Sequence, residues 1–574
     1  MNLSEHTLQI EALLEGYRCG TFTPEAVIDE VLRRSAAKEY ESIWIHLADR
    51  EHLQPFLDHL ATESPRNLPL FGIPFAIKDN IDVSGVPTTA GCPGYRYMPG
   101  QSAFPVQLLI DAGAIPIGKT NMDQFATGLT GTRSPFGVPP NRYNKKYIPG
   151  GSSSGSASAV AHHLVSFSLG TDTAGSGRVP AAFNGLLGWK PTRGIVSASG
   201  VVPACRSLDC VSVFAQSVPD VRRVMPVLIQ ADSRDEYSRP FSPSPASSPQ
   251  GFQKVGVPAE STWRFFDNTE YEALYRKAIH RMEALGYECR EIDFTPFQNA
   301  ASLLYEGPWV AERTTALSPF LESHPEQILP VTRKIIERGK SFSATDVFTA
   351  QYRLKALEKA AAQIWQQVDF LLLPTAGTIY TIDEVMADPI QLNSHLGYYT
   401  NFMNLLDLSA FALPAGFACE CLPFGITVCA PAFSDFHLLS VAEQWAAHPN
   451  HSFIDIAVCG AHMRGFPLNG QLVERGGRFV KNNWTAPEYR FFKLNSEPPK
   501  PGLLHTRTDG VAIEVEIWQL PEATIGRFLH QIPRPLGLGK IKLSDDTLVT
   551  GFLVESSAVE DATDISTLGS WKKA

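Results

Sequence analysis

Two serine-glycine segments and one upstream lysine are the residues of this chain best suited to catalysis. One segment, at residues 149–156, reads PGGSSSGS, and the other, at residues 170–178, reads GTDTAGSGR. Lys78 ends the apolar run GIPFAIK, and Ser152 and Ser176 lie 24 residues apart. One lysine and two serines can form a proton relay that activates a serine hydroxyl without histidine or aspartate. The pattern therefore indicates hydrolysis through a serine nucleophile.

The lysine can act in such a relay only as a neutral amine. The ordinary pKa of a lysine is about 10.4, so action near neutral pH requires a fall of about 2–3 units. Burial lowers the pKa of a lysine because it disfavours the charged form. Since Lys78 follows an apolar run, we expect a short buried strand at residues 70–77 that delivers the amine at its end.

Two other motifs match catalytic patterns by letter but lack the necessary context. Residues 113–120 read GAIPIGKT, a P-loop pattern. The residues before it have a helical pattern and its interior is apolar, so we expect a helix that ends at Gly113 and then a buried strand. Residues 151–155 read GSSSG, which would make Ser153 the nucleophile of a strand-turn-helix elbow, but the loop-like residues 141–147 precede them. A glycine-serine surface loop is the alternative interpretation for either serine segment taken alone.

The elements that must position these residues follow two different patterns along the chain. Strand and helix patterns alternate to about residue 445, which is typical of an α/β domain. After a break near residues 446–451 the candidates are strands at 454–458, 510–518 and 550–554 and one short helix around 522–529. We therefore expect an α/β domain over residues 1–445 and a β-rich domain over residues 446–574. Two domains suit a chain of 574 residues, because a single core rarely grows that large.

Charge and composition exclude several classes of partner. The net charge is −10 and no block of lysine and arginine occurs, so nucleic acid is not expected as a partner. The sequence contains no run of about 18 apolar residues and no N-terminal signal pattern, so we expect a cytoplasmic protein that does not enter a membrane. The nine cysteines form no paired C-x-x-C motif, which favours buried reduced thiols over metal ligands. We expect no cofactor, no metal, and a homodimer.

The lysine and the serine segments together resemble the amidase signature family. The matching blocks, in the family's order within about residues 5–440, are 72–80, 118–126, 149–156, 170–176 and 404–425. The resemblance implies an α/β amidase signature fold with a large mixed β-sheet flanked by helices. It implies Ser176 as the nucleophile, Ser152 as a bridging serine held by a cis peptide bond, and Lys78 as the base. Residues 154–155 and 174–175 read SG and AG where the family usually has two glycines, but they remain small.

The backbone before Ser176 is suited to stabilise the oxyanion that its attack would create. Small residues there let a substrate carbonyl approach the backbone closely. The N–H groups suited to this oxyanion hole belong to Thr173, Ala174, Gly175 and Ser176. Asp172 and Arg178 flank the same loop, and we expect them to form a supporting ion pair.

A second segment bears on the substrate. Tyr305 and Arg313 lie on a helical pattern that is interrupted near Gly307, and both could face a pocket. The planar fork of an arginine suits a small carboxylate, although a core tyrosine and a surface arginine are the simpler interpretation of the spacing. The block resembles that of the allophanate hydrolases, a branch of the family whose tyrosine and arginine hold the substrate carboxylate. Arg133, in the segment 128–135, is a further candidate for the same role.

The β-rich domain carries a resemblance of its own. Residues 459–472 resemble the start of the allophanate hydrolase C-terminal domain, which is similar to the γ-glutamyl cyclotransferase-like β-barrel. The loop at residues 529–535 lacks the glutamate that cyclotransferases use, so that activity is not expected. In some allophanate hydrolases this domain is thought to decarboxylate the first product, a role open here to His462 with Asn469 and Gln471. A structural histidine in a scaffolding domain is the alternative.

The resemblance as a whole implies hydrolysis of allophanate (urea-1-carboxylate) to ammonia and carbon dioxide through an acyl-enzyme. Two other functions remain open. One is an amidase of broader specificity in the same family. The other is an amidotransferase component that supplies ammonia to partner proteins, against which the extra β-rich domain argues.

Overall fold

The chain forms two compact units. The computed structural model describes residues 8–242, 252–447, 453–475, 477–497, 499–529 and 532–574. The first unit comprises Met1–Gly416 and Pro423–His448, and the second comprises Phe417–Leu422 and Pro449–Ala574. The domain boundary between residues 445 and 446 stays a prediction, and residues 448–452 lie outside the described part. None of the described helices is both long and apolar enough to cross a membrane.

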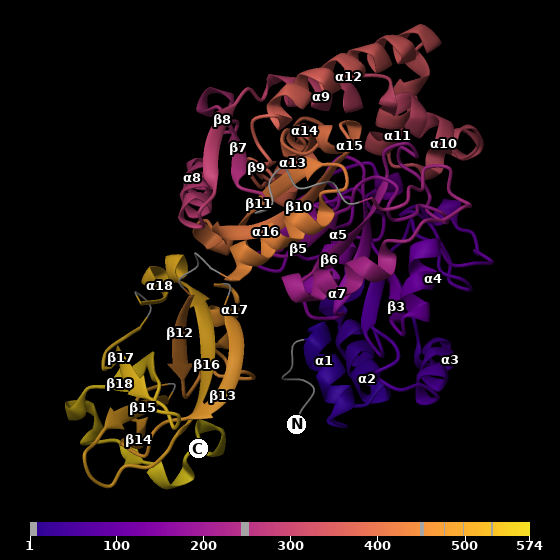
Figure 1. Ribbon diagram of the computed structural model, residues 1–574. Coiled ribbons are helices and arrows are strands. Elements are labelled where there is room, and N and C mark those ends of the chain that lie inside the picture. Colours follow the sequence, from indigo (N-terminus) through magenta and orange to yellow (C-terminus); the bar gives the residue numbers. More distant parts are fainter. Residues whose placement is uncertain (1–7, 243–251, 448–452, 476, 498, 530–531) are drawn as a thin grey trace. The chain divides into compact units, whose positions relative to one another are not determined.

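The first unit is built on one mixed sheet of eleven strands (Figure 1). In order across the sheet these are β1 (Trp44–Leu47), β3 (Ile115–Thr120), β2 (Pro74–Lys78), β4 (Phe167–Asp172), β6 (Cys210–Ala215), β5 (Leu187–Lys190), β10 (Leu408–Phe417), β11 (Pro423–Pro431), β9 (Phe370–Pro374), β7 (Lys254–Pro258) and β8 (Glu288–Ile292). Strand β2 is parallel to both of its neighbours, β3 and β4, whereas β4 and β5 pair antiparallel with β6. The large mixed sheet that the family resemblance implies is thus present.

Helices flank this sheet (Figure 1). They are α1 (Ile10–Arg18), α2 (Pro24–Ser35), α3 (Arg50–Ala61), α4 (Phe104–Asp111), α5 (Ser154–Ala161), α6 (Val179–Phe183), α7 (Val218–Leu228), α8 (Thr269–Ala284), α9 (Thr295–Tyr305), α10 (Trp309–Ser323), α11 (Pro330–Glu337), α12 (Ala344–Trp365), α13 (Ile382–Ala387), α14 (Gln391–Leu396), α15 (Phe402–Leu405) and α16 (Asp435–Ala447). The break between α9 and α10 falls at residues 306–308, where the sequence predicts an interruption.

The central strands are buried along their whole length. Every residue of β2, β3, β4 and β6 is buried, which is typical of strands covered on both faces. Polar residues at the ends of such strands are therefore carried into the interior. Lys78 ends β2 in this way, and Thr171 and Asp172 end β4.

Two strands begin later than the apolar runs that contain their first residues. Strand β2 begins at Pro74, because residues 70–73 form a buried turn in which Gly72 has a φ of +68°. Strand β4 begins at Phe167 although the apolar run begins at residue 164. Residues 164–166 are buried as well, so their apolar character reflects burial rather than strand pairing.

The segment that matches a P-loop is a buried strand, as its apolar interior predicts. Helix α4 ends just before Gly113, and β3 contains Lys119. The Lys119 ammonium lies 3.2 Å from Asp79 Oδ1 and donates a hydrogen bond of 2.8 Å to Thr88 Oγ1. Since all three side chains lie in the interior, Lys119 has a structural partner where a P-loop lysine would face phosphate.

The second unit is β-rich, as predicted. Its five-stranded sheet runs, in order, β13 (Arg478–Trp484), β16 (Glu514–Pro521), β12 (Phe453–Val458), β18 (Leu548–Val554) and β17 (Leu536–Lys542). Its three-stranded sheet runs β15 (Lys500–His505), β14 (Tyr489–Leu494) and β19 (Thr563–Asp564). Its helices are α17 (Asn469–Val473) and α18 (Glu522–Leu529). The sequence predicts only α18 of these helices. Of the strands it predicts β12, β16 and β18 and misses β13, β14, β15, β17 and β19.

Candidate active site

Two parallel neighbouring strands bring the predicted catalytic residues to one edge of the sheet. Strand β2 pairs with β4 from Phe75 opposite Phe167 to Ile77 opposite Leu169. The carboxyl ends of both strands therefore meet, and Lys78 comes to lie beside the loop that follows β4. Ser152 reaches the same edge from the loop before α5.

The Lys78 side chain is fully buried between two hydroxyl groups. Its Nζ lies 2.7 Å from Ser152 Oγ and 2.7 Å from Thr171 Oγ1. Burial lowers the pKa of Lys78 to about 7, although three nearby carboxylates oppose this fall. Arg313 adds to the fall through its own positive charge. The amine is therefore partly neutral at neutral pH, as a proton acceptor must be.

Backbone contacts hold the loop that carries Ser152. The peptide bond between Gly151 and Ser152 is cis, as the family resemblance implies. The Gly151 N–H donates to Leu129 O at 2.8 Å, and the Asp123 N–H donates to Ser152 O at 3.0 Å. The neighbouring Ser153, the candidate of the elbow motif, uses its hydroxyl on the backbone of Thr171 at 3.1–3.3 Å. Ser153 thus has a structural role between the Ser152 loop and strand β4.

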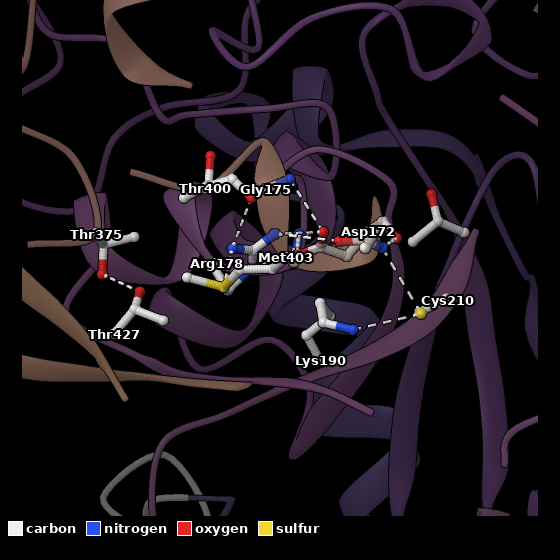
Figure 2. A network of polar contacts seen from close by, with 12 residues as sticks. Asp172, Gly175, Arg178, Lys190, Cys210, Thr375, Thr400, Met403 and Thr427 are labelled. Atoms are coloured by element: carbon white, nitrogen blue, oxygen red, sulfur yellow. Dashed lines mark hydrogen bonds and ion pairs between the residues drawn. The ribbon is translucent and has the colours of Figure 1, made fainter. Parts of the chain in front are cut away.

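The loop that carries Ser176 is wrapped around one buried carboxylate (Figure 2). Asp172 accepts hydrogen bonds of 3.0 Å from the backbone N–H groups of Gly175 and Gly177. Arg178 donates to both oxygens of Asp172 at 2.8 Å, which confirms the expected ion pair. Burial raises the pKa of Asp172, but Arg178 outweighs it and leaves that pKa below its ordinary value. Asp172 therefore fixes the turn that presents Ser176.

Three of the four backbone groups of the predicted oxyanion hole are available. Within the described residues, the N–H groups of Thr173, Ala174 and Ser176 have no hydrogen-bond partner, whereas Gly175 donates to Asp172. The Ser176 hydroxyl likewise makes no hydrogen bond among these residues, so its link to Ser152 stays a prediction.

A close contact sets the backbone of the same loop. Gly175 has a φ of +136°, which favours glycine, and a Cβ at this position would meet Thr400 Oγ1 at 2.5 Å. The Thr400 carbonyl accepts a hydrogen bond of 3.2 Å from Arg178. Thr400 and the Asp172–Arg178 pair thus hold the loop in its present shape (Figure 2).

Two of the three candidates for carboxylate recognition contact Thr127, and the third lies beside one of them. Arg313 donates to Thr127 Oγ1 at 2.6 Å, and Arg133 donates to the Thr127 carbonyl at 2.9 Å. The Arg313 guanidinium lies 5.8 Å from the centre of the Tyr305 ring. Both arginines are nearly fully buried, and Arg133 Nε has no hydrogen-bond partner among the described residues. The simpler interpretation of Arg313 as a surface residue is therefore wrong.

The histidine cluster of the second unit is also assembled. His462 Nε2 lies 3.1 Å from Gln471 Oε1, and Asn469 donates to the His462 carbonyl at 2.8 Å. The imidazole stacks on the Phe552 ring, with centroids 5.4 Å apart. Burial lowers the pKa of His462, so the ring is neutral at neutral pH.

Sequence reasoning missed three residues that shape the site in the first unit. Thr171 lies in the GTDT segment, and its place two residues before Thr173 gave no sign of contact with Lys78. Thr127 and Asp209 belong to no motif, and only the fold brings them to the site. A hydroxyl at the end of a buried strand was the one available signal, since such groups need a partner.

Comparisons with known proteins identify the family of the chain. Residues 26–439 match the family model described as Amidase, and residues 454–574 match the model described as Allophanate hydrolase C-terminal domain. A selenomethionine-substituted allophanate hydrolase from Kluyveromyces lactis has 38% sequence identity and a TM-score of 0.73, with 98% of each chain covered.

Two groups of curated relatives cover different parts of the chain. A urea amidolyase from Saccharomyces cerevisiae is 39% identical over 584 residues, which make up 95% of this chain and 32% of that protein. This chain thus spans about a third of the length of the urea amidolyases that it matches. A component of the glutamyl-tRNA(Gln) amidotransferase from Methanosarcina mazei is 30% identical and covers 74% of this chain, with 96% of its own length matched.

Proposed function

This chain belongs to the amidase signature family and ends in an allophanate hydrolase C-terminal domain, and from that premise we propose that it hydrolyses allophanate. The observation that carries the proposal is the buried amine of Lys78 in contact with Ser152, on the edge of the sheet that also presents Ser176. The second support is the cluster of Tyr305, Arg313 and Arg133, which offers a carboxylate two buried guanidinium groups.

The first half of the reaction makes an acyl-enzyme. Ser176 Oγ attacks the carbon of the terminal amide, and its proton passes to Ser152 while the Ser152 proton passes to the neutral amine of Lys78. The tetrahedral oxyanion accepts hydrogen bonds from the available N–H groups of Thr173, Ala174 and Ser176. The relay then returns a proton to the amide nitrogen, the C–N bond breaks, and ammonia leaves.

Thr171 makes the direction of this proton transfer definite. A neutral amine has two N–H groups and a single lone pair. If one N–H donates to Thr171 Oγ1, the lone pair is free to face the Ser152 hydroxyl, 2.7 Å away. Thr171 therefore orients the base without touching the substrate.

The second half of the reaction hydrolyses the acyl-enzyme and releases N-carboxycarbamate. Water, activated by the same relay, attacks the carbamoyl ester on Ser176, and the C–O bond to the serine breaks. The product is N-carboxycarbamate, which loses carbon dioxide to give carbamate and then ammonia with a second carbon dioxide. One allophanate thus yields two molecules of ammonia.

Substitution of the nucleophile tests the mechanism. Ser176→Ala should abolish allophanate turnover while the protein stays folded. Ser153→Ala is the matched control in the adjacent loop, and it should lose at most about tenfold because Ser153 contacts only backbone. Full activity of Ser176→Ala would refute the mechanism.

A comparison of substrates separates the rival functions. Allophanate, malonamate and simple amides would be assayed with the wild type and with Arg313→Ala. We expect the variant to lose the substrates that carry a carboxylate and to retain simple amides. Equal losses on all three classes would favour an amidase of broader specificity. Co-purification with partner proteins would favour the amidotransferase function.

We infer a separate role for the second unit, which we take to be γ-glutamyl cyclotransferase-like in fold. His462, supported by Gln471 and Asn469, would assist the loss of carbon dioxide from N-carboxycarbamate, whose nitrogen takes its proton from water. Part of the cyclotransferase loop, residues 530–531, lies outside the described residues. A homodimer and a cytoplasmic location also stay predictions.

Product counting tests this role. His462→Gln should leave the release of the first ammonia unchanged and slow the release of carbon dioxide and of the second ammonia. If both products appear at the wild-type rate, decarboxylation is spontaneous and the second unit is a scaffold.

A further inference from the structure

Asp209 contacts the oxyanion loop, by which we mean residues 173–176, from a separate segment of the chain. It lies on the segment 204–209, just before β6, and its carboxylate accepts a hydrogen bond from the Thr173 hydroxyl. The same carboxylate accepts the backbone N–H groups of Ala204 at 2.8 Å and Cys205 at 3.2 Å. Thr173 is the first residue of the predicted oxyanion hole, so the hydrogen bond to Asp209 fixes one end of the oxyanion loop.

The segment that carries Asp209 is also tied to helix α10. Glu312 accepts two hydrogen bonds of 2.7 Å from Ser207, one from its N–H and one from its hydroxyl. Glu312 is next to Arg313 on α10. One six-residue segment therefore contacts both the loop before Ser176 and the helix that carries the carboxylate-binding arginine.

We propose that Asp209 is a positioning residue for the reaction, which fixes the oxyanion loop through Thr173 without touching the substrate. This inference rests on the proposed function, because it assigns Asp209 to the loop that stabilises the oxyanion. Loss of the Asp209 acceptor frees the Thr173 hydroxyl and lets the adjacent N–H groups move away from the developing charge.

The chain offers a closely matched control in Asp235. Asp209 and Asp235 both line one cavity of about 260 Å³ in the first unit. Asp235 also accepts two backbone N–H groups, those of Ala198 and Tyr237, and one hydroxyl, that of Ser197. Its hydroxyl partner lies outside the oxyanion loop. The two carboxylates differ in two respects: only Asp209 reaches Thr173, and only Asp209 is among the carboxylates that raise the pKa of Lys78.

The test compares Asp209→Asn with Asp235→Asn in the full chain. A fluorophosphonate ester, which reacts with activated serines, measures the reactivity of Ser176 independently of the natural substrate. We expect Asp209→Asn to lower kcat and the labelling rate by about tenfold to a hundredfold, less than the loss of an oxyanion donor itself, with KM within about twofold. Asp235→Asn should leave both rates within about twofold even where it lowers the melting temperature equally.

Thr173→Val removes the hydroxyl but keeps the backbone N–H, and it extends the test. It should reproduce the loss seen in Asp209→Asn, and the double variant should be no slower than either single one. Equal rates for the two aspartate variants, or independent effects of Asp209→Asn and Thr173→Val, would overturn the proposal. If Asp209→Asn fails to fold, an unchanged labelling rate in Thr173→Val would by itself overturn the proposal.

The labelling assay keeps this inference distinct from the substrate assignment. Labelling of Ser176 without turnover of allophanate would refute the substrate while the labelling rates still decide the role of Asp209. A wild-type Ser176 that resists labelling and turns nothing over would refute both.

Discussion

At the scale of single residues, the protonation state of Lys78 governs the chemistry. Burial lowers its pKa to about 7, so the neutral, active amine predominates above pH 7 and declines below it. Activity should therefore rise with pH through about 7, and at pH 6 it should be roughly a tenth of its plateau value. The measurement is a profile of kcat/KM between pH 5.5 and 9. An acid limb centred below pH 5 would show that Lys78 is not the base.

Thr171 offers a second prediction at this scale. Thr171→Val keeps the shape of the side chain but leaves one N–H of the buried amine without an acceptor. An unsatisfied buried donor costs about 1–3 kcal/mol, and a barrier raised by that much lowers kcat by roughly 5-fold to 150-fold. Thr171→Ser, which restores the hydroxyl, should recover most of the activity. Wild-type kcat in Thr171→Val would show that the lone pair needs no such orientation.

At the scale of elements, the turn between β4 and α6 depends on the Asp172–Arg178 pair. Both side chains are fully buried, so Arg178→Met would leave an uncompensated carboxylate in the interior. Such losses cost about 3–5 kcal/mol of stability. Denaturation by urea would measure this cost. Arg33→Met removes an exposed arginine from Glu30, which still pairs with Arg34, so this control should cost at most about 1 kcal/mol.

Particular elements show how far the sequence predicts this fold. The apolar run before Lys78 and the run in β3 were sufficient to place two buried strands and to dismiss the P-loop match. Strand starts were less predictable, because residues 70–73 and 164–166 are as apolar as the strands that follow them. Burial in a turn and burial in a strand select the same residue types, and pairing with a distant strand decides between them.

The site residues that belong to sequence motifs were predictable, whereas the site residues that only the fold brings together were not. Ser152 and Ser176 stand out by their glycine-rich neighbours, and Lys78 by its place after an apolar strand. Asp209 has no such signal, because its contact with Thr173 joins residues that are 36 apart in the sequence. Interactions of this kind depend on strand order, which no local pattern reveals.

At the scale of the whole molecule, the two compact units have hydrophobic cores of their own. We therefore expect two transitions in thermal unfolding, one for each unit. Arg178→Met should lower the melting temperature of one transition and leave the other unchanged, since both members of its ion pair lie in the first unit. A calorimetric scan checks this, and a single transition shifted as a whole would contradict it.

The position of Arg313 near Lys78 has a consequence for the two kinetic constants. In the empty site, the positive charge of Arg313 helps to lower the pKa of Lys78. A substrate carboxylate bound to Arg313 cancels part of that charge, so the pKa of Lys78 is higher in the complex than in the free enzyme. The profile of kcat/KM reports the free enzyme and that of kcat reports the complex. The acid limb of kcat should therefore lie at the higher pH with allophanate, and the two limbs should coincide with an uncharged amide.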